Sequence, residues 1–201
     1  MYITVHNAAT YCYTGGKAFD AAKPTIIFIH GVLNDHSVWI LQSRYIAHHG
    51  YNVLAVDLPG HCKSAGNPPT TIEEAADFVL ALMDAAGLEQ ATLIGHSMGS
   101  LIALEAAGRA PQRARQLVLV GTAFPMKVSP ALLDASLNTP MKALEMVNVF
   151  SRSTLAAPPS AISAAAREGV VAMLERCWML AKDREVRTWG EGTGTRGEER
   201  D

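Results

Sequence analysis

Short, continuous runs of apolar residues alternate with stretches of helical periodicity over the first 120 residues. The runs predict strands that are buried on both faces, at Thr25–Ile29, Asn52–Val56, Ala91–Ile94 and Gln116–Val120. Apolar residues at helical spacing lie between them, at Val38–His49, Ile72–Ala86 and Met98–Arg109. Strands and helices that alternate at this spacing predict an α/β fold with a mostly parallel sheet and helices on both faces.

Local signals place the ends of several elements. Met1–Asn7 alternates apolar and polar residues and predicts a first strand. Thr10–Tyr13 is expected to pair with it, with Gly15-Gly16 closing this unit. Thr70 and Glu73 are spaced as a capping box at the start of the second helix. Together with the four buried strands, these two bring the predicted number of strands to six.

The pattern changes after Gly121. Ser129-Pro130 and Thr139-Pro140 have the form of an N-cap followed by proline, which predicts the starts of two short helices. Five methionines, which suit either an apolar pocket or ordinary packing, follow at Met126, Met141, Met146, Met173 and Met179. Residues 182–201 include 11 charged residues and four glycines without an apolar period, so we expect a disordered tail there.

Composition and charge narrow the class of protein. The chain has 201 residues, of which 49% are hydrophobic and 18% are charged, as expected for one core-forming domain. The formal net charge of -2 gives no general attraction to nucleic acid or to an anionic membrane. The first residues lack a basic and apolar leader, and no run approaches 18 apolar residues, so a cytoplasmic protein without a membrane span is expected.

The cysteines and histidines do not form a recognisable metal motif. Cys12, Cys62 and Cys177 are odd in number and far apart, which argues against a disulfide framework. Neither His48-His49 nor His61-Cys62 has metal-ligand spacing, so no metal site is expected. No G-x-G-x-x-G motif is present, and no cofactor is expected.

One motif carries nucleophile chemistry. Gly95-His96-Ser97-Met98-Gly99 matches G-x-S-x-G, and it stands between the predicted strand Ala91–Ile94 and a helix rich in small residues. In this context the serine hydroxyl of Ser97 is lifted above the sheet by a sharp turn, for which Gly95 and Gly99 leave room. The amide of Met98, at the helix N-terminus, then faces a developing oxyanion.

Two loops complete the pattern. His30-Gly31-Val32 follows the strand Thr25–Ile29, and the amide of Val32 is placed to be the second oxyanion donor. Trp39 is spaced to pack near this loop. Asp57–Ser64, which reads DLPGHCKS, directly follows the next strand.

These three motifs, in this order over about residues 10–125, resemble the α/β-hydrolase superfamily, in particular a bacterial branch with an HG loop, a DLPGHG loop and a GHSMG elbow. The resemblance implies an α/β-hydrolase core over 1–121 and a helical cap segment over 122–181, whereas the charged tail over 182–201 does not resemble the family. It also implies a serine nucleophile at Ser97 and oxyanion amides at Val32 and Met98. Serine at the elbow argues against the epoxide hydrolases and haloalkane dehalogenases, which use a carboxylate there.

The chain departs from the family pattern in two respects. Cys62 replaces the usual glycine of the second loop; an exposed thiol is one interpretation, and a chance replacement is favoured over a catalytic role. The family's acid and histidine base should follow the cap, yet the last of the seven histidines is His96, whose position in the family points away from the nucleophile. Gly121–Ala123, where some members carry the acid, has no carboxylate.

The expected function is therefore a serine hydrolase of the α/β-hydrolase superfamily that acts on a small ester, lactone or related acyl substrate. The triad acid and base are not found in this chain, and a truncation or frameshift after about Ser160 would explain this. His30 is interpreted as a residue that braces its loop, and His36 and His61 are weak substitutes for the base. A non-catalytic binding module and a non-functional truncated product stay open, as do haloperoxidase and carbon–carbon hydrolase chemistry and the oligomeric state.

Overall fold

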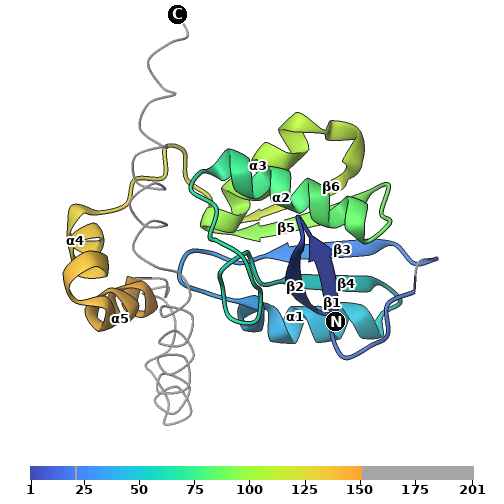
Figure 1. The fold of residues 1–201 in the computed structure, drawn as a ribbon, viewed down its shortest axis with the longest axis horizontal. Helices are drawn as coiled ribbons and strands as arrows, with labels where there is room; N and C mark the ends of the chain where they lie inside the picture. Colours follow the sequence, from blue (N-terminus) through green and yellow to red (C-terminus); the bar gives the residue numbers. More distant parts are fainter. Residues whose placement is uncertain (21, 151–201) are drawn as a thin grey trace, which may run out of the picture.

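A six-stranded sheet forms the centre of the molecule (Figure 1). The computed structural model describes residues 1–20 and 22–150. The strands are β1 (Tyr2–Val5), β2 (Ala8–Tyr13), β3 (Thr25–Ile29), β4 (Asn52–Val56), β5 (Ala91–His96) and β6 (Ala114–Val120). They lie in the order β1-β2-β4-β3-β5-β6. The neighbours among β3, β4, β5 and β6 pair in parallel, whereas β2 pairs antiparallel with both β1 and β4. The predicted α/β fold with a mostly parallel sheet is confirmed.

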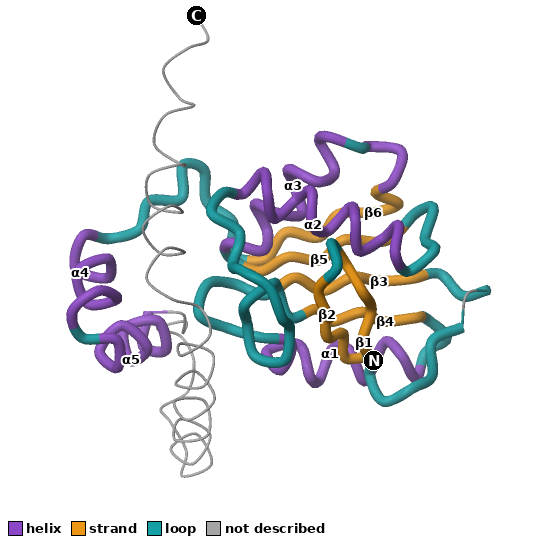
Figure 2. Tube along the Cα trace, viewed as in Figure 1, coloured by secondary structure: helices purple, strands orange, loops and turns teal. Residues whose placement is uncertain are grey.

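Helices cover both faces of this sheet (Figure 2). The helices of the described residues are η1 (His36–Trp39), α1 (Ile40–His48), α2 (Ile72–Ala85), α3 (Met98–Arg109), η2 (Pro111–Arg113), α4 (Pro130–Asn138) and α5 (Pro140–Phe150). Of these, α1 covers one face and α2 and α3 cover the other, whereas α4 and α5 lie to one side of the sheet. The predicted helix Val38–His49 therefore divides into a short 3₁₀ turn and α1. Among the described residues, no helix is both long and apolar enough to cross a bilayer.

The strand β3 explains why the apolar runs are continuous. All five of its residues are buried. Ile27 and Ile29 belong to the apolar core shared with α2 and α3, whereas Phe28 packs on the opposite face with Trp39 of η1 and Ala47 of α1. Because helices cover both faces, neither side of the strand can be polar.

The turn between β1 and β2 corrects one prediction. Val5 pairs with Ala8, so the two-residue loop is His6-Asn7, and both residues have positive φ, 48° and 62°. Two positive φ values are the requirement of the tight hairpin turn that matches strand twist. The prediction that Gly15-Gly16 closes the pair is wrong. Gly15 instead follows β2, where a Cβ would overlap α1 at Ser43 and Ala47.

The start of α2 lies one residue later than the predicted capping box. Thr71 is the N-cap, with extended backbone, and its hydroxyl accepts a hydrogen bond from the Glu74 amide at 3.1 Å. The Glu74 carboxylate in turn accepts a hydrogen bond from the Thr70 amide at 2.7 Å. The motif thus uses Thr71 and Glu74 in place of Thr70 and Glu73. The hydrogen bonds from Thr70 lower the pKa of Glu74 below its usual value.

The part after β6 begins with two helices. Ser129 caps α4, accepting a hydrogen bond from the Leu132 amide at 3.2 Å, and Pro130 is the first helical residue, as predicted. Leu144 of α5 is buried against Leu33 of the loop after β3. The predicted cap over 122–181 is therefore described as far as residue 150. Its remainder and the predicted tail over 182–201 lie outside the described residues.

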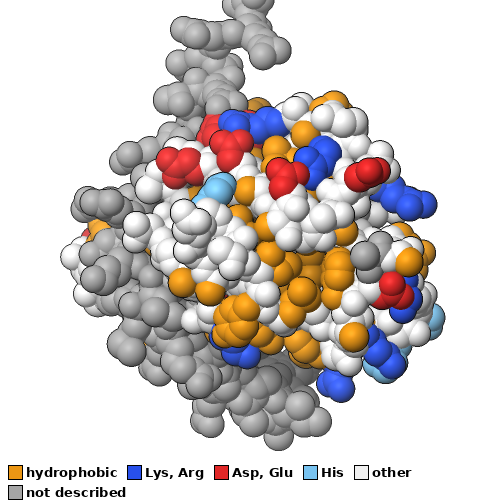
Figure 3. Space-filling view, turned by 45° about the vertical axis from the view of Figure 1, so that its right-hand side comes forward, with side chains coloured by type: hydrophobic (Ala, Val, Ile, Leu, Met, Phe, Trp, Pro, Cys, Tyr) orange, Lys and Arg blue, Asp and Glu red, His pale blue; other side chains and the backbone are white. Residues whose placement is uncertain are grey.

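Charged side chains of both signs are interspersed on the face seen in Figure 3. Ion pairs between charged side chains also link α2 to the helices that follow it. Arg109 of α3 contacts Asp77 of α2 at 2.6 Å, and Arg113 of η2 contacts Asp84 at 2.6 Å. Such mixed pairs agree with the small net charge of the chain.

Replacing Thr71 by alanine should lower the free energy of unfolding by about 1 kcal/mol, because the Glu74 amide loses its side-chain acceptor. Thr70→Ala is the matched control, since the Thr70 amide keeps its bond to Glu74 and only an exposed hydroxyl contact is lost. Urea unfolding of both variants measures the difference. Equal losses in the two variants would contradict the observed position of the cap.

Candidate active site

Ser97 stands at a strained turn between β5 and α3. Its backbone has φ 53° and ψ -123°, a combination that residues other than glycine rarely adopt. The Ser97 amide donates to the Val120 carbonyl of β6 at 2.9 Å, and the Ser97 carbonyl accepts from the Ser100 amide at 2.8 Å and from the Ser100 hydroxyl at 2.5 Å. These bonds on both sides of the residue hold the strained conformation.

The turn fits because Gly95 and Gly99 lack a side chain, and a third glycine, Gly31, lies close to it. A Cβ on Gly95 would overlap the Gly99 carbonyl. A Cβ on Gly99 would overlap the Ile29 carbonyl and lie 2.5 Å from that of His30. A Cβ on Gly31 would lie 3.2 Å from the Cβ of Ser97, so the loop after β3 runs directly beside Ser97.

Val32 and Met98 line one cavity together with Ser97. Met98 is the first residue of α3, where the amide has no carbonyl partner within the helix and the helix dipole is positive. The cavity has a volume of about 210 Å³. Its other lining residues, mostly apolar, are Leu33, Ile72, Leu101, Met126, Lys127, Val128, Ser129 and Leu132.

The methionines after Gly121 have different surroundings. Met126 lines the cavity, and its sulfur lies 3.9 Å from the Ser97 hydroxyl oxygen. Met141 is 41% exposed on α5. Met173 and Met179 lie outside the described residues. Met126 is therefore the methionine that lines the apolar cavity beside Ser97.

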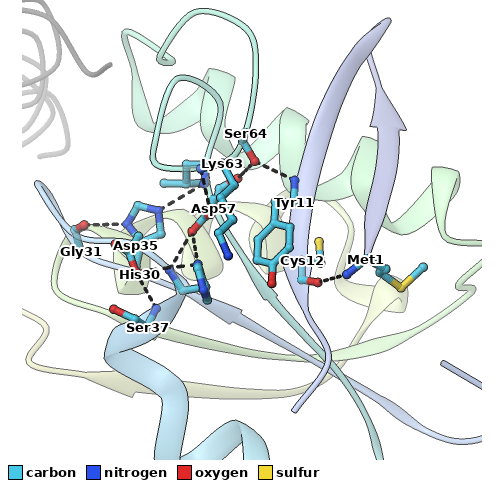
Figure 4. Close-up of polar contacts among 12 residues, drawn as sticks. Met1, Tyr11, Cys12, His30, Gly31, Asp35, Ser37, Asp57, Lys63 and Ser64 are labelled. Atoms are coloured by element: carbon cyan, nitrogen blue, oxygen red, sulfur yellow. Dashed lines mark hydrogen bonds and ion pairs between the residues drawn. The ribbon is translucent and has the colours of Figure 1, made fainter. Parts of the chain in front are cut away.

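His30 joins the two loops that follow β3 and β4 (Figure 4). Its Nε2 accepts a hydrogen bond from the Leu58 amide at 3.2 Å, so the proton of the neutral ring is on Nδ1, 2.8 Å from the Gly31 carbonyl. The side chain is fully buried. Both ring nitrogens therefore have partners in the loops, which is the bracing arrangement predicted for His30.

The other histidines near the elbow also contact residues other than Ser97. The His96 ring lies edge-on to Trp39, with centroids 6.4 Å apart, and partial burial lowers the pKa of His96 below its usual value. His61 Nδ1 lies 3.0 Å from the Pro59 carbonyl. His36 Nδ1 lies 2.8 Å from the Asp57 carboxylate.

Asp57, the first residue of the DLPGHCKS motif, anchors a polar network that the motif did not predict. It is fully buried at the end of β4, and its carboxylate accepts hydrogen bonds from the amides of His36 at 2.8 Å and Lys63 at 3.2 Å. Ser64 continues the network by donating to the Asp57 carbonyl at 2.6 Å and accepting from the Tyr11 amide at 2.8 Å (Figure 4). The available sequence signal was a carboxylate directly after a buried strand.

Cys62 differs from its predicted setting. The side chain is partly buried, so the expectation of an exposed thiol is wrong. Its backbone φ is 43°, in the left-handed region that favours glycine. The DLPGHG loop of the α/β-hydrolase branch described above has glycine at this position. The positive φ of residue 62 gives a physical reason for that glycine.

The comparison with protein families agrees with this architecture. The family model described as "alpha/beta hydrolase fold" matches residues 24–169, and the chain belongs to this family. In structure, the chain is similar to the enol-lactonase from Burkholderia xenovorans LB400, with a TM-score of 0.74 and 23% identity, covering 97% of this chain and 74% of that one. At this identity the likeness concerns the fold.

Curated relatives are similar in part of their sequence. The dihydrolipoyllysine-residue acetyltransferase component of the acetoin cleaving system of Cupriavidus necator is 40% identical over 111 residues, 55% of this chain and 28% of that protein. The putative carbamate hydrolase RutD of Agrobacterium fabrum is 33% identical over 103 residues, 50% of this chain and 39% of that protein. The chain thus spans less than half the length of these relatives.

Gly99→Ala should destabilise the fold by roughly 1–3 kcal/mol, because the new methyl group overlaps two backbone carbonyls. Gly108→Ala is the control in the same helix, where a Cβ meets nothing within 4 Å. That change should stabilise the fold by about 0.5–1 kcal/mol through helix propensity. Chemical denaturation that finds the same effect for both would contradict the close contact at Gly99.

Cys62→Gly should be more stable than Cys62→Ala by about 1 kcal/mol, because alanine retains the strain of the positive φ. Both variants remove the thiol, so their difference isolates the backbone. Urea unfolding in the presence of a chelator and a reductant gives the two free energies. A more stable alanine variant, as at ordinary positions, would contradict the left-handed conformation.

Proposed function

We propose that the Ser97 site is an acyl site of the serine hydrolase type, for a small ester or lactone. The observation that carries this proposal is the strained Ser97, which faces a cavity that Val32 and Met98 also line. Strain of this kind persists only where the surroundings determine it, and it is concentrated at functional sites.

In the proposed reaction, the Ser97 oxygen attacks the acyl carbonyl, and the carbonyl oxygen gains the negative charge. The amides of Val32 and Met98 would bind this oxyanion, aided by the positive end of α3. Collapse of the intermediate breaks the bond to the leaving oxygen, which takes up the proton that the Ser97 hydroxyl lost, and leaves an ester on Ser97. Water then attacks this ester, releases the acid and returns a proton to the Ser97 oxygen.

The cavity limits the size of the acyl group. Its volume of about 210 Å³ is below the range of about 300–1,000 Å³ that holds drug-sized ligands. Leu101, Met126 and Leu132 make its wall apolar, with Lys127 and Ser129 as polar members. The names of similar proteins, among them an enol-lactonase and Lipase LipV of Mycobacterium tuberculosis, also favour an ester or lactone.

A second function, ligand binding without turnover, is favoured by the contacts of the histidines among the described residues. The hydrogen bonds given above for His30, His36 and His61 go to loop residues. A serine hydroxyl needs a base within hydrogen-bond distance to be an efficient nucleophile. A site with the pocket and the oxyanion amides alone would bind an acyl compound and turn it over slowly.

A fluorophosphonate probe tests whether Ser97 is reactive. We expect the probe to label Ser97, as located by peptide mass spectrometry, and the Ser97→Ala variant to reduce labelling at least ten-fold. Ser136→Ala, which removes a buried serine of α4, should leave labelling unchanged. A folded protein in which Ser97 is not labelled would contradict its proposed role.

Turnover of p-nitrophenyl acetate separates the two functions. Sustained hydrolysis that Ser97→Ala abolishes supports the hydrolase. Labelling without turnover supports the binding site, because a triad without its base retains only the contribution of the oxyanion amides and of binding.

A further inference from the structure

Four side chains of metal-binding type converge outside the Ser97 cavity. They are Asp35, His36, Asp57 and Cys62, and one ligand atom from each lies within 4.8 Å of all the others. Asp35 is the N-cap of η1 and His36 its first residue, whereas Asp57 and Cys62 lie in the loop after β4. We propose that this cluster is a site for a divalent transition metal ion, with Zn²⁺ as the preferred ion.

The donor set matches the chemistry of zinc. Two carboxylates, one imidazole and one thiolate are four ligands of the kinds that Zn²⁺ accepts. With bonds of about 2.0–2.3 Å, tetrahedral ligand atoms lie about 3.3–3.8 Å apart. The ligand atoms of the cluster lie at most 4.8 Å apart, about 1 Å beyond this spacing, and the 2.8 Å contact of His36 Nδ1 with Asp57 is shorter than it, so the side chains have to adjust when the ion binds.

Backbone amides already hold both carboxylates in place. Asp57 accepts hydrogen bonds from the amides of His36 and Lys63, at 2.8 and 3.2 Å. Asp35 accepts one from the Ser37 amide at 2.7 Å (Figure 4). Outer contacts of this kind orient metal ligands and limit their freedom before the ion binds. The cluster therefore has its supporting hydrogen bonds in place.

Burial and charge favour a cation. The side chains of Asp35 and Asp57 are 1% and 0% exposed, and both face one imidazole, with His36 Nδ1 at 3.7 and 2.8 Å. Two buried carboxylates with oxygen atoms within 4.8 Å of one another attract a divalent cation. Binding of Zn²⁺ releases the Cys62 thiol proton to solvent, and the two positive charges of the ion exceed the one negative charge that the thiolate adds.

The conformation of Cys62 and the route to solvent fit this assignment. A cysteine with φ 43° carries strain that glycine would avoid, yet it brings a thiol to the cluster. Cys62 is only partly buried, which leaves an entry path for the ion. The ligands come from two segments without a regular spacing, so the sequence motif rules for zinc do not detect them.

Cobalt(II) binding to the reduced, metal-free protein tests the proposal. We expect one Co²⁺ per chain, a thiolate-to-cobalt charge-transfer band in the near ultraviolet, and displacement of the cobalt by Zn²⁺. Cys62→Gly should abolish the band and weaken binding at least ten-fold. Because glycine suits the backbone at this position, the variant should remain folded, as its unfolding curve without metal will verify.

Two further variants locate the ion. His36→Asn should weaken Co²⁺ binding at least ten-fold, whereas Cys177→Ser, which changes a thiol outside the described residues, should retain the band and the affinity. Zn²⁺ should raise the Tm of the wild-type protein by several degrees and leave that of Cys62→Gly unchanged. Absence of stoichiometric binding, or a band and affinity that survive in Cys62→Gly, would overturn the proposal.

Discussion

The first turn of α3 lies directly against the carboxyl ends of β3 and β5, and the geometry of the Ser97 site depends on this contact. Gly95 and Gly99 make the contact possible, since a Cβ at either position would overlap a backbone carbonyl. The approach fixes the direction of the helix, places Met98 at its positive end and forces Ser97 into its strained conformation. The positions of the cavity and of the Met98 amide therefore follow from the backbone and do not depend on the side chains around them.

Much of the core could be predicted because, for each of its strands and helices, one local sequence pattern determines where the element begins and ends. The strand Thr25–Ile29 is apolar throughout, since helices cover both faces, and its predicted bounds agree with the structure. The helix Met98–Arg109 agrees as well, because the elbow starts it and Pro111 follows its end. These local patterns report directly on burial and on backbone constraints.

Other features could not be predicted because two residues competed for one role or because the partners were remote in sequence. Thr70 and Thr71 are both suitable N-caps, and the chain stays extended through the second. His6-Asn7 supplies the hairpin turn without a glycine. Asp57 and His36 are 21 residues apart in the sequence, and their side chains form a hydrogen bond. They meet because β3 and β4 are parallel neighbours, so the segments that follow the two strands lie at the same edge of the sheet.

The hydrogen bonds between these loops also define what can be exchanged in this fold. His30 is bonded to Leu58, and His36 is bonded to Asp57, so the segment that carries Val32 is fastened to its neighbour at both ends. A foreign 30–39 loop without a histidine at position 36 would take the imidazole contact away from the buried Asp57 carboxylate, at a cost of about 1–3 kcal/mol. An exchange of the oxyanion loop in this protein therefore has to include residues 57–64 as well.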